Sequence, residues 1–300
     1  NIDAVDDVTI AEALMATGAG SQIDIDSGGN VSFTANGDLT ADAGITVTAD
    51  AGLSGLYGLT MDAGLTFDAG GGPITLYSGS DMTLGSLTTT SFGPDAVKLT
   101  SAAGAVTDTG FTITAPNGDL VVDAASGIEL ATQVGSLDLS NSSMGAVIIT
   151  EMDDVDIVSV DQMATGDPVH IEAGGVTMGS GASVASFTDV SLTATGLNGG
   201  SGEIDMGDGA LVSAGGRVDL GADGDVILGR VVTTSSMEVA VVVNSDNGAI
   251  LDAGDSGGKD IDATLGGARL GAATGIGSTA DSIETALAAM TRTPVHLIGS

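Results

Sequence analysis

The sequence predicts an all-β protein, a parallel β-solenoid (β-helix) whose coils each take about 20–23 residues. Three observations lead to this fold class. Short triplets of apolar, polar and apolar residues recur along the chain, which is the alternation typical of strands with one buried face. Gly, Asp, Asn and Ser residues, which favour tight turns, flank these triplets. The 300 residues include 48 glycines but only 2% aromatic residues, so the core must consist of small aliphatic layers.

The triplets can be followed in chain order. Strands so short and so closely spaced do not form a β-sandwich, whose strands are longer and carry larger side chains. The predicted strands are Val8–Ile10, Ile23–Ile25, Val31–Phe33, Ile45–Val47, Leu59–Met61, Leu65–Phe67, Ile74–Leu76, Met82–Leu84, Val97–Leu99, Phe111–Ile113, Leu120–Val122, Leu137–Leu139, Val147–Ile149, Val155–Ile157, Val169–Ile171, Val176–Met178, Val190–Leu192, Ile204–Met206, Val218–Leu220, Val226–Leu228, Ile261–Ala263 and Ala268–Leu270.

The coil length follows from the return of similar triplets. Leu76 returns at Leu99, and Leu84 returns at Val106. Further along the chain, Ile149 returns at Ile171 and Ile157 at Met178. Each coil is therefore expected to hold two or three strands, with equivalent strands stacked in register. This length predicts about 14 coils and, at about 4.8 Å per coil, a rod on the order of 65 Å.

A longer repeat divides the chain into two copies. The Gly-Ile pairs that start at Gly127 and Gly275 are 275 − 127 = 148 residues apart, and Asp7 and Asp154 lie in matching phrases 154 − 7 = 147 residues apart. We therefore expect a tandem duplication with copies at 7–153 and 154–300, and residues 1–6 in the preceding coil. The start at Asn1, without Met or a leader-like stretch, indicates an excised or processed piece.

One stretch departs from the strand pattern. Residues 278–290, STADSIETALAAM, combine a capping Ser or Thr with early acids and with apolar Ile283, Leu287 and Met290 at helical spacing. A short helix or lid over a turn is one interpretation. An irregular loop is the other, because the first copy has the shorter GIELATQVGSL in this place.

The charge limits the possible partners. Forty acids against six bases give a formal net charge of −34. We expect no nucleic-acid partner, because a phosphate backbone requires a basic face. No membrane insertion is expected either, since no apolar run approaches about 18 residues. The absence of Cys excludes a disulfide framework.

The acidic turns are the candidate metal sites, and Ca²⁺ is the only cofactor considered. Carboxylates in such turns offer oxygen ligands to Ca²⁺. Calcium-binding β-rolls repeat GGxGxDxUx strictly, whereas GGNVSFTANGD and GGRVDLGADGD miss that spacing. The alternative is that Asp simply favours turns and solvates the rod. The candidate ligands are Asp153, Asp154, Asp156, Asp223 and Asp225, and the pairs Asp205 with Asp208 and Asp252 with Asp255 have similar spacing.

No catalytic constellation is predicted, so we do not expect an enzyme. His170 lies in the middle of a triplet, where alternation points it outward, and His296 lies in a comparable place. A polysaccharide lyase on a β-helix needs a basic groove and aromatic residues that stack on sugars. An ice-binding face needs a flat ladder of T-x-T motifs, but motifs such as Thr46 with Thr48 occur at changing positions.

The Gly-Ile elements carry a resemblance to a known family. GIGSTADSIETALAAM and GIELATQVGSLDL resemble the "ATGIGS…ETAV…L" element of large bacterial surface proteins of the filamentous haemagglutinin-like class. The phrases GDVILG, LTATG and ITEMDDVDI resemble the strand-turn repeats of that class. The resemblance implies a secreted, right-handed β-solenoid that serves as the shaft of an adhesin, matrix protein or surface fibre. It carries over no site residue and no ligand.

The expected function is structural, at the bacterial cell surface or outside the cell. The segment would form part of a shaft, either continuing in a longer repetitive chain or associating with itself end to end by strand addition. The rival interpretation is an adhesin module that binds a glycan or a surface protein directly. Its candidate contacts are Tyr57 and Tyr77 with the Gly-rich loops around them.

Overall fold

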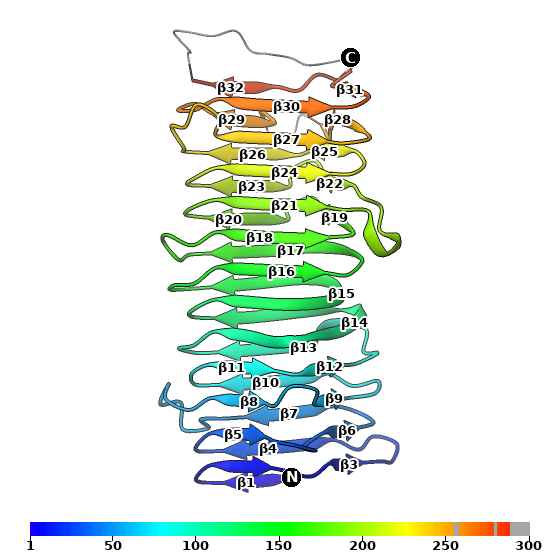
Figure 1. Cartoon of the computed structure of the whole chain (residues 1–300), viewed down its shortest axis with the longest axis vertical. Coiled ribbons are helices and arrows are strands. Elements are labelled where there is room, and N and C mark those ends of the chain that lie inside the picture. The colour runs from blue at the N-terminus through cyan, green and yellow to red at the C-terminus, as the bar shows by residue number, and fades with distance from the viewer. Residues whose placement is uncertain (255–257, 279–280, 289–300) are drawn as a thin grey trace. The chain divides into compact units, whose positions relative to one another are not determined.

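The computed structural model describes residues 1–254, 258–278 and 281–288. The described chain is all-β, with 55% of residues in strands and a single short 3-10 helix, η1 (Leu197–Gly199). It forms two compact units, Asn1–Ile149 and Thr150–Ser300. Figure 1 shows that the strands of each unit are stacked as successive turns of a parallel β-solenoid. The predicted fold class is therefore confirmed.

In the first unit, each turn contributes strands to three columns. The strand pairings within these columns are parallel, as expected when the chain returns to the same place after each turn. The first column holds β1 (Ile2–Ala4), β4 (Ile23–Ser27), β7 (Ile45–Thr48), β10 (Ile74–Ser78), β13 (Gly93–Ser101) and the last parts of β14 (Val106–Ala124) and β15 (Ile128–Asn141). The second column holds β2 (Val8–Ile10), β5 (Val31–Phe33), β8 (Leu59–Met61), β11 (Met82–Leu84) and the starts of β14 and β15. The third column holds β3 (Leu14–Ala16), β6 (Leu39–Ala41), β9 (Thr66–Asp68), β12 (Ser86–Thr88) and the middle parts of β14 and β15.

The second unit repeats the three-column plan. It begins at Thr150, within β16 (Val147–Glu151). One column holds β18 (Val169–Ala173), β21 (Val190–Ala194), β24 (Val218–Ala222), β27 (Val241–Ser245) and β30 (Ala268–Ala272). The next column holds the start of β17 (Asp154–Gln162), β19 (Gly175–Met178), β22 (Ile204–Met206), β25 (Val226–Leu228), β28 (Ala249–Asp252) and β31 (Gly275–Ile276). The last column holds the end of β17, β20 (Ser183–Ser186), β23 (Leu211–Ala214), β26 (Arg230–Thr233), β29 (Ile261–Ala263) and β32 (Thr285–Leu287).

The predicted coil length holds for ordinary turns but not for all of them. Leu76 pairs with Leu99 as expected, whereas the partner of Val106 is Met82 and not Leu84. Longer turns occur as well, since Ile45 pairs with Ile74, 74 − 45 = 29 residues later. The described residues form about 12 turns rather than the 14 expected for the chain, and loops inserted between strands lengthen some of these turns.

The core of each unit is built from the inward residues of the triplets. Leu76, Leu99 and Leu192 are completely buried, while the residues on either side of each are at least partly exposed. In the first unit the core also contains two stacked aromatic rings, Phe33 and Phe67, whose centroids lie 4.7 Å apart at 72°. The aliphatic core inferred from composition is thus correct apart from this edge-to-face pair.

Buried hydroxyl groups join successive turns at the corners. The Ser101 hydroxyl donates to the Ser80 carbonyl of the preceding turn at 2.7 Å. In the second unit the Ser245 hydroxyl donates to the Gly224 carbonyl, also at 2.7 Å. At a corner, some backbone carbonyls have no N–H partner in a strand ladder. The hydroxyl groups of these small side chains supply the missing donors.

The stretch predicted to be a helix or a loop contains a strand instead. Thr285–Leu287 forms β32, and Ala286 pairs in parallel with Asp262. The ladder offers these residues backbone partners in the preceding turn, which outweighs the weak preference of a short segment for helix. Residues 279–280 and 289–290 of this stretch lie outside the described residues. In the described part of the chain, no helix has the length and apolar composition needed to cross a membrane.

Threonine positions are more regular in space than they are along the chain. The outward faces of β2, β5, β8, β11 and β14 form one row of hydroxyl residues, namely Thr9, Ser32, Thr60, Thr83 and Thr107. This row is single. The T-x-T motif of Thr46 and Thr48 ends in the next turn, where Thr48 pairs with Tyr77.

Candidate cation site and acidic turns

The aspartates directly before strands have a structural role. Asp7 precedes β2, and its Oδ1 accepts the backbone N–H of Asn30, the equivalent residue one turn later, at 2.7 Å. Asp81 accepts the N–H of Ala105 in the same way, at 3.0 Å. Each carboxylate thus adds a rung between two turns just outside the strand ladder, and a hydrogen bond to a charged acceptor is stronger than a neutral one.

The second unit uses the same arrangement. The carboxylate of Asp189 accepts the N–H of Arg217 at 2.7 Å, and Asp225 accepts that of Ala249 at 2.7 Å. Much of the acidic composition therefore serves turn geometry. This is the alternative that the sequence left open beside calcium binding.

The five predicted calcium ligands lie in two different places. Asp154 and Asp156 lie on β17, and Oδ1 of Asp154 accepts the N–H of Ser201 at 2.8 Å. Asp223 accepts a hydrogen bond from the Asn247 side chain at 2.7 Å. Together with Asp153 and the rung-forming Asp225, none of them belongs to a group of three metal-ligating side chains in the described part of the chain. Calcium binding by these five residues stays a prediction.

The structure brings together a different trio, Asp252, Asp260 and Glu284. One carboxylate oxygen from each lies within 4.8 Å of the others. Asp252 ends β28, Asp260 directly precedes β29, and Glu284 directly precedes β32. Asp260 and Glu284 are neighbours because β29 and β32 pair in parallel. Asp252 and Asp260 come from one turn and Glu284 from the next.

Hydrogen bonds satisfy only some of the carboxylate oxygens in this cluster. Oδ2 of Asp260 accepts the N–H of Glu284 at 2.8 Å, which repeats the rung seen elsewhere. Oδ1 of Asp252 accepts the N–H of Gly254 at 2.7 Å, and Oε1 of Glu284 accepts the Ser282 hydroxyl at 2.9 Å. Oδ2 of Asp252 and Oε2 of Glu284 are buried and have no hydrogen-bond partner.

The sequence identified only part of this cluster. The spacing of Asp252 to Asp255, which lies outside the described residues, suggests a cation ligand, whereas Glu284 is one of the early acids of the possible helix in 278–290. Asp260 resembles the other pre-strand aspartates, so its position before Ile261 was a usable signal. The meeting of the three depends on the register of β29 with β32, which the sequence pattern does not reveal.

The histidines and tyrosines noted in the sequence are not members of this cluster. His170 lies on the outward face of β18 and pairs with Ser191 in the register. His296 lies outside the described residues. Tyr57 and Tyr77 are half-buried in the first unit. Tyr57 is the penultimate residue of the loop 50–58, and its carbonyl accepts the N–H of Ser80 at 2.9 Å.

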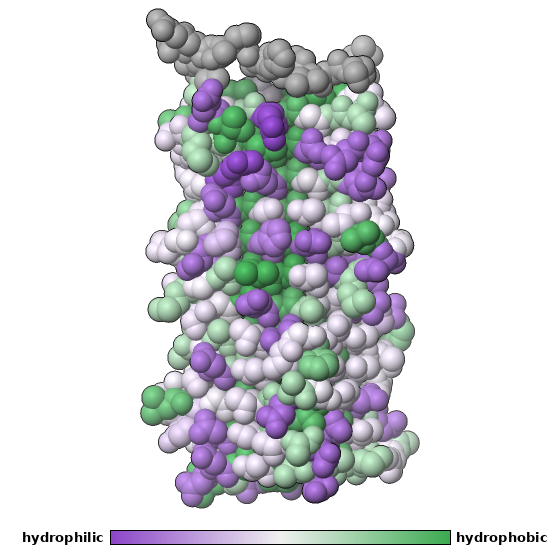
Figure 2. Space-filling model, viewed as in Figure 1, coloured by the Kyte–Doolittle hydropathy of each residue, from purple (hydrophilic) through white to green (hydrophobic). Residues whose placement is uncertain are grey.

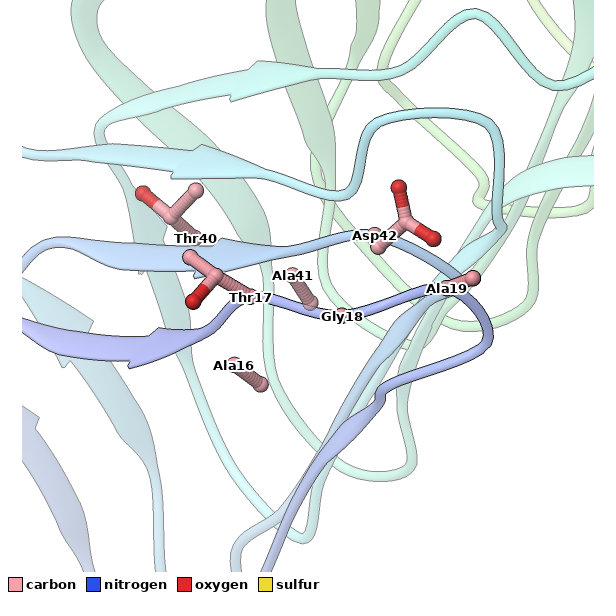
Figure 3. A pocket seen from close by; sticks show the side chains of 7 residues that line it. All are labelled: Ala16, Thr17, Gly18, Ala19, Thr40, Ala41 and Asp42. Carbon is pink, nitrogen blue, oxygen red and sulfur yellow. The ribbon is translucent and has the colours of Figure 1, made fainter.

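The first unit also has a shallow depression of about 330 Å³ beside β3 and β6 (Figure 3). It is lined by small side chains and by one charged residue, Asp42, and Figure 3 shows Thr17 and Thr40 among the residues that line it. The Asp42 carboxylate accepts the N–H of Gly20 at 3.0 Å. This depression therefore presents few groups that would recognise a small molecule.

Comparisons with protein-family models, with curated protein sequences and with solved structures found no match to this chain. The resemblance to filamentous haemagglutinin-like proteins accordingly stays a prediction. What is established is a parallel β-solenoid with repeated turns in each unit.

Proposed function

We propose that this chain is a structural β-solenoid segment forming part of the shaft of a bacterial surface fibre, filament or adhesin outside the cell. The observation that supports this proposal is the parallel, in-register stacking within each unit, in which each turn repeats the three strands of the one before. Each turn contacts mainly its neighbours, so further turns lengthen such a structure without altering the existing ones.

The outward surface is consistent with a shaft. Its rows consist mostly of small polar or acidic residues, such as the hydroxyl row from Thr9 to Thr107. Figure 2 shows hydrophilic residues distributed among apolar and intermediate ones over the visible face. The net charge of −34 would oppose lateral bundling of neighbouring shafts at low salt.

Electron microscopy of the full-length native protein tests the shaft. We expect thin rods whose length grows in proportion to the number of turns, and rods of the isolated chain that join end to end as concentration rises. Sedimentation velocity over the same concentrations measures the joining. Compact particles in the native protein would contradict the shaft, and a monomer at all concentrations would contradict end-to-end association.

A direct binding role is the second candidate, and the loop 50–58 favours it. Leu53 and Leu56 are each 71% exposed, and half-buried Tyr57 follows them. Exposed apolar and aromatic side chains in one loop are typical of contacts with a partner. The shaft and this role are compatible if the loop is the contact point.

A glycan array and a surface-protein binding assay separate the two candidates. If the loop binds, replacing both Tyr57 and Tyr77 by Ala should abolish the signal, whereas Phe92→Ala, an exposed aromatic residue outside the loop, should leave it unchanged. Absence of binding by the unaltered chain would leave the shaft as the better proposal.

A further inference from the structure

We propose that Asp252, Asp260 and Glu284 hold a divalent cation of the calcium class. The site lies between two successive turns of the second unit and would connect β28, β29 and β32. The inference rests on these residues alone and does not depend on the proposed shaft.

The spacing of the oxygens fits a shared ion. Oxygen ligands lie about 2.3–2.6 Å from Ca²⁺, so two ligands of one ion are at most about 5 Å apart. The three carboxylates each place an oxygen within 4.8 Å of the others. Without a cation, three like charges at this separation repel one another.

The unpartnered oxygens provide an independent observation. Oδ2 of Asp252 and Oε2 of Glu284 are fully shielded from solvent and accept no hydrogen bond. Leaving a buried charged oxygen without a partner is strongly unfavourable. Asp252 and Glu284 each accept a hydrogen bond at their other carboxylate oxygen. Among the described acidic residues that are not exposed, only these two have a second carboxylate oxygen that is both buried and unpartnered. A bound cation would supply the missing partner.

The nearby basic residues do not fill this role. Arg230 directly precedes Val231, whose N–H donates to the Asp260 carbonyl at 2.7 Å, so Arg230 is close in the stack. However, Nε of Arg230 is itself buried without a hydrogen-bond partner. Lys259 is exposed, and the ion pairs found among the described residues are Lys98 with Asp95 and Arg217 with Asp219.

Calcium fits the chemistry better than other common cations. The ligands are all carboxylate oxygens, without the nitrogen or sulfur that favours zinc. Ca²⁺ accepts irregular oxygen shells, whereas Mg²⁺ requires near-ideal octahedral geometry and retains several waters. Because Glu284 comes from a different turn than Asp252 and Asp260, the ion would cross-link the two turns.

Isothermal titration of the full chain with CaCl2, after treatment with a chelator, tests the site. We expect about one Ca²⁺ per chain with a Kd below about 1 mM, the weak end of protein calcium sites, and weaker binding of MgCl2. Asp252→Asn and Glu284→Gln should each weaken binding by about tenfold or more. They retain the shape of the side chains and the acceptors for Gly254 and Ser282.

Asp189→Asn is the matched control. Asp189 also precedes a strand and accepts one backbone N–H in the second unit, so this variant should bind Ca²⁺ like the unaltered chain. Binding that never saturates, disappears in about 0.5 M NaCl, where surface charges are strongly screened, and is unchanged in Glu284→Gln would show diffuse attraction and overturn the proposal.

Hydrogen exchange supplies a local measurement that does not depend on the folding of any variant. In the unaltered chain, saturating CaCl2 should slow exchange of the amides in β29 and β32, and leave exchange in β4 and β7 of the first unit unchanged. Unchanged exchange in β29 and β32 would contradict the site. If Arg230 neutralises the acids instead, the chain will bind no Ca²⁺ and Arg230→Gln will lower Tm, which also overturns the proposal.

Discussion

Gly72 illustrates how closely successive turns approach at a corner of the first unit. A Cβ atom built on Gly72 would lie 2.0 Å from the carbonyl carbon of Ala43, one turn earlier. Neighbouring Gly71 has no atom within 4 Å of the same position and is exposed. The stacked turns therefore leave no room for a side chain at Gly72, whereas a side chain at Gly71 would meet no other atom.

We expect Gly72→Ala to destabilise the protein by about 1–3 kcal/mol, because the backbone of Ala43 cannot move aside without disturbing its own turn. Gly71→Ala is the matched control and should change the free energy of unfolding by less than about 0.5 kcal/mol. Chemical denaturation of both variants measures the difference. Equal stability of the two would contradict the close approach.

Asp50 shows how one carboxylate orders a loop. Its backbone has a φ of 63°, in the left-handed region, and its carboxylate accepts hydrogen bonds from the Ser54 hydroxyl, the Ser54 N–H and the Gly55 N–H at 2.7, 3.0 and 2.6 Å. Burial alone would raise the pKa of Asp50, but the hydrogen bonds from Ser54 and Gly55 together outweigh it and hold the pKa below its ordinary value.

A lowered pKa means that the ionised form is favoured by folding. This stabilisation is present above the ordinary value of 3.8 and is lost as the pH falls through the folded-state pKa. Asp50→Asn, which still tolerates a positive φ, should therefore have a lower Tm than the unaltered chain at pH 7, and the difference should disappear in strong acid. Exposed Asp161→Asn is the control and should leave Tm nearly unchanged at both pH values.

At the scale of elements, the strands depend on their neighbours in the column. β10 pairs with β7 on one side and with β13 on the other, so Leu76 is completely buried between Val47 and Leu99. Its neighbour in the chain, Thr75, points outward and is half-buried. The same strand thus has one face that carries the stability and one that is free to vary.

Leu76→Ala should destabilise the protein by about 2–5 kcal/mol, because it removes buried apolar surface and leaves a cavity between two turns. Thr75→Ala should have an effect of about 0.5 kcal/mol or less. Denaturant unfolding gives both values. Hydrogen exchange should show that loosening in Leu76→Ala is greatest in β7, β10 and β13, since turns contact mainly their neighbours; uniform loosening would contradict this.

For the whole molecule, the charge is the dominant feature. The pKa of Asp138, in the first unit, shows the effect of the neighbouring negative charges. Partial burial raises the pKa of its carboxyl, and the negative charges of Asp123, Asp95 and Asp119 raise that pKa further. Ionisation of Asp138 is thus less favourable in the folded chain than in the unfolded one, so at neutral pH its charge opposes folding.

Salt should therefore stabilise this protein. Raising NaCl from about 0.01 M to about 1 M shortens the Debye length from about 30 Å to about 3 Å, which screens the repulsion among the acids. We expect Tm to rise over this range. Asp138→Asn should raise Tm at low salt, and its advantage should shrink at high salt. A Tm that falls with NaCl would show that attractive ion pairs outweigh the repulsion.

The local pattern accounts for much of the fold. Alternating triplets such as Ile74–Leu76 predict strands and the side that is buried, because alternation along a strand is a local property. Turn residues such as those in Gly70–Pro73 predict where the chain bends. The pattern wrongly matches Leu84 with Val106, because the length of the intervening loop hides the register. It also misses the strand Thr285–Leu287, because that segment is short and its pattern fits a helix as well.

The sequence by itself determined the β-solenoid class, the inward aliphatic residues and the acidic surface, since composition and the two-residue period are sufficient for each of these. Only the tertiary structure decided which residues meet across turns. Loops that a solenoid accommodates at little cost change the spacing between equivalent strands, so Asp252, Asp260 and Glu284 come together at intervals that no fixed repeat predicts. The candidate cation site is therefore a product of register, which depends on the stacked backbone of neighbouring turns.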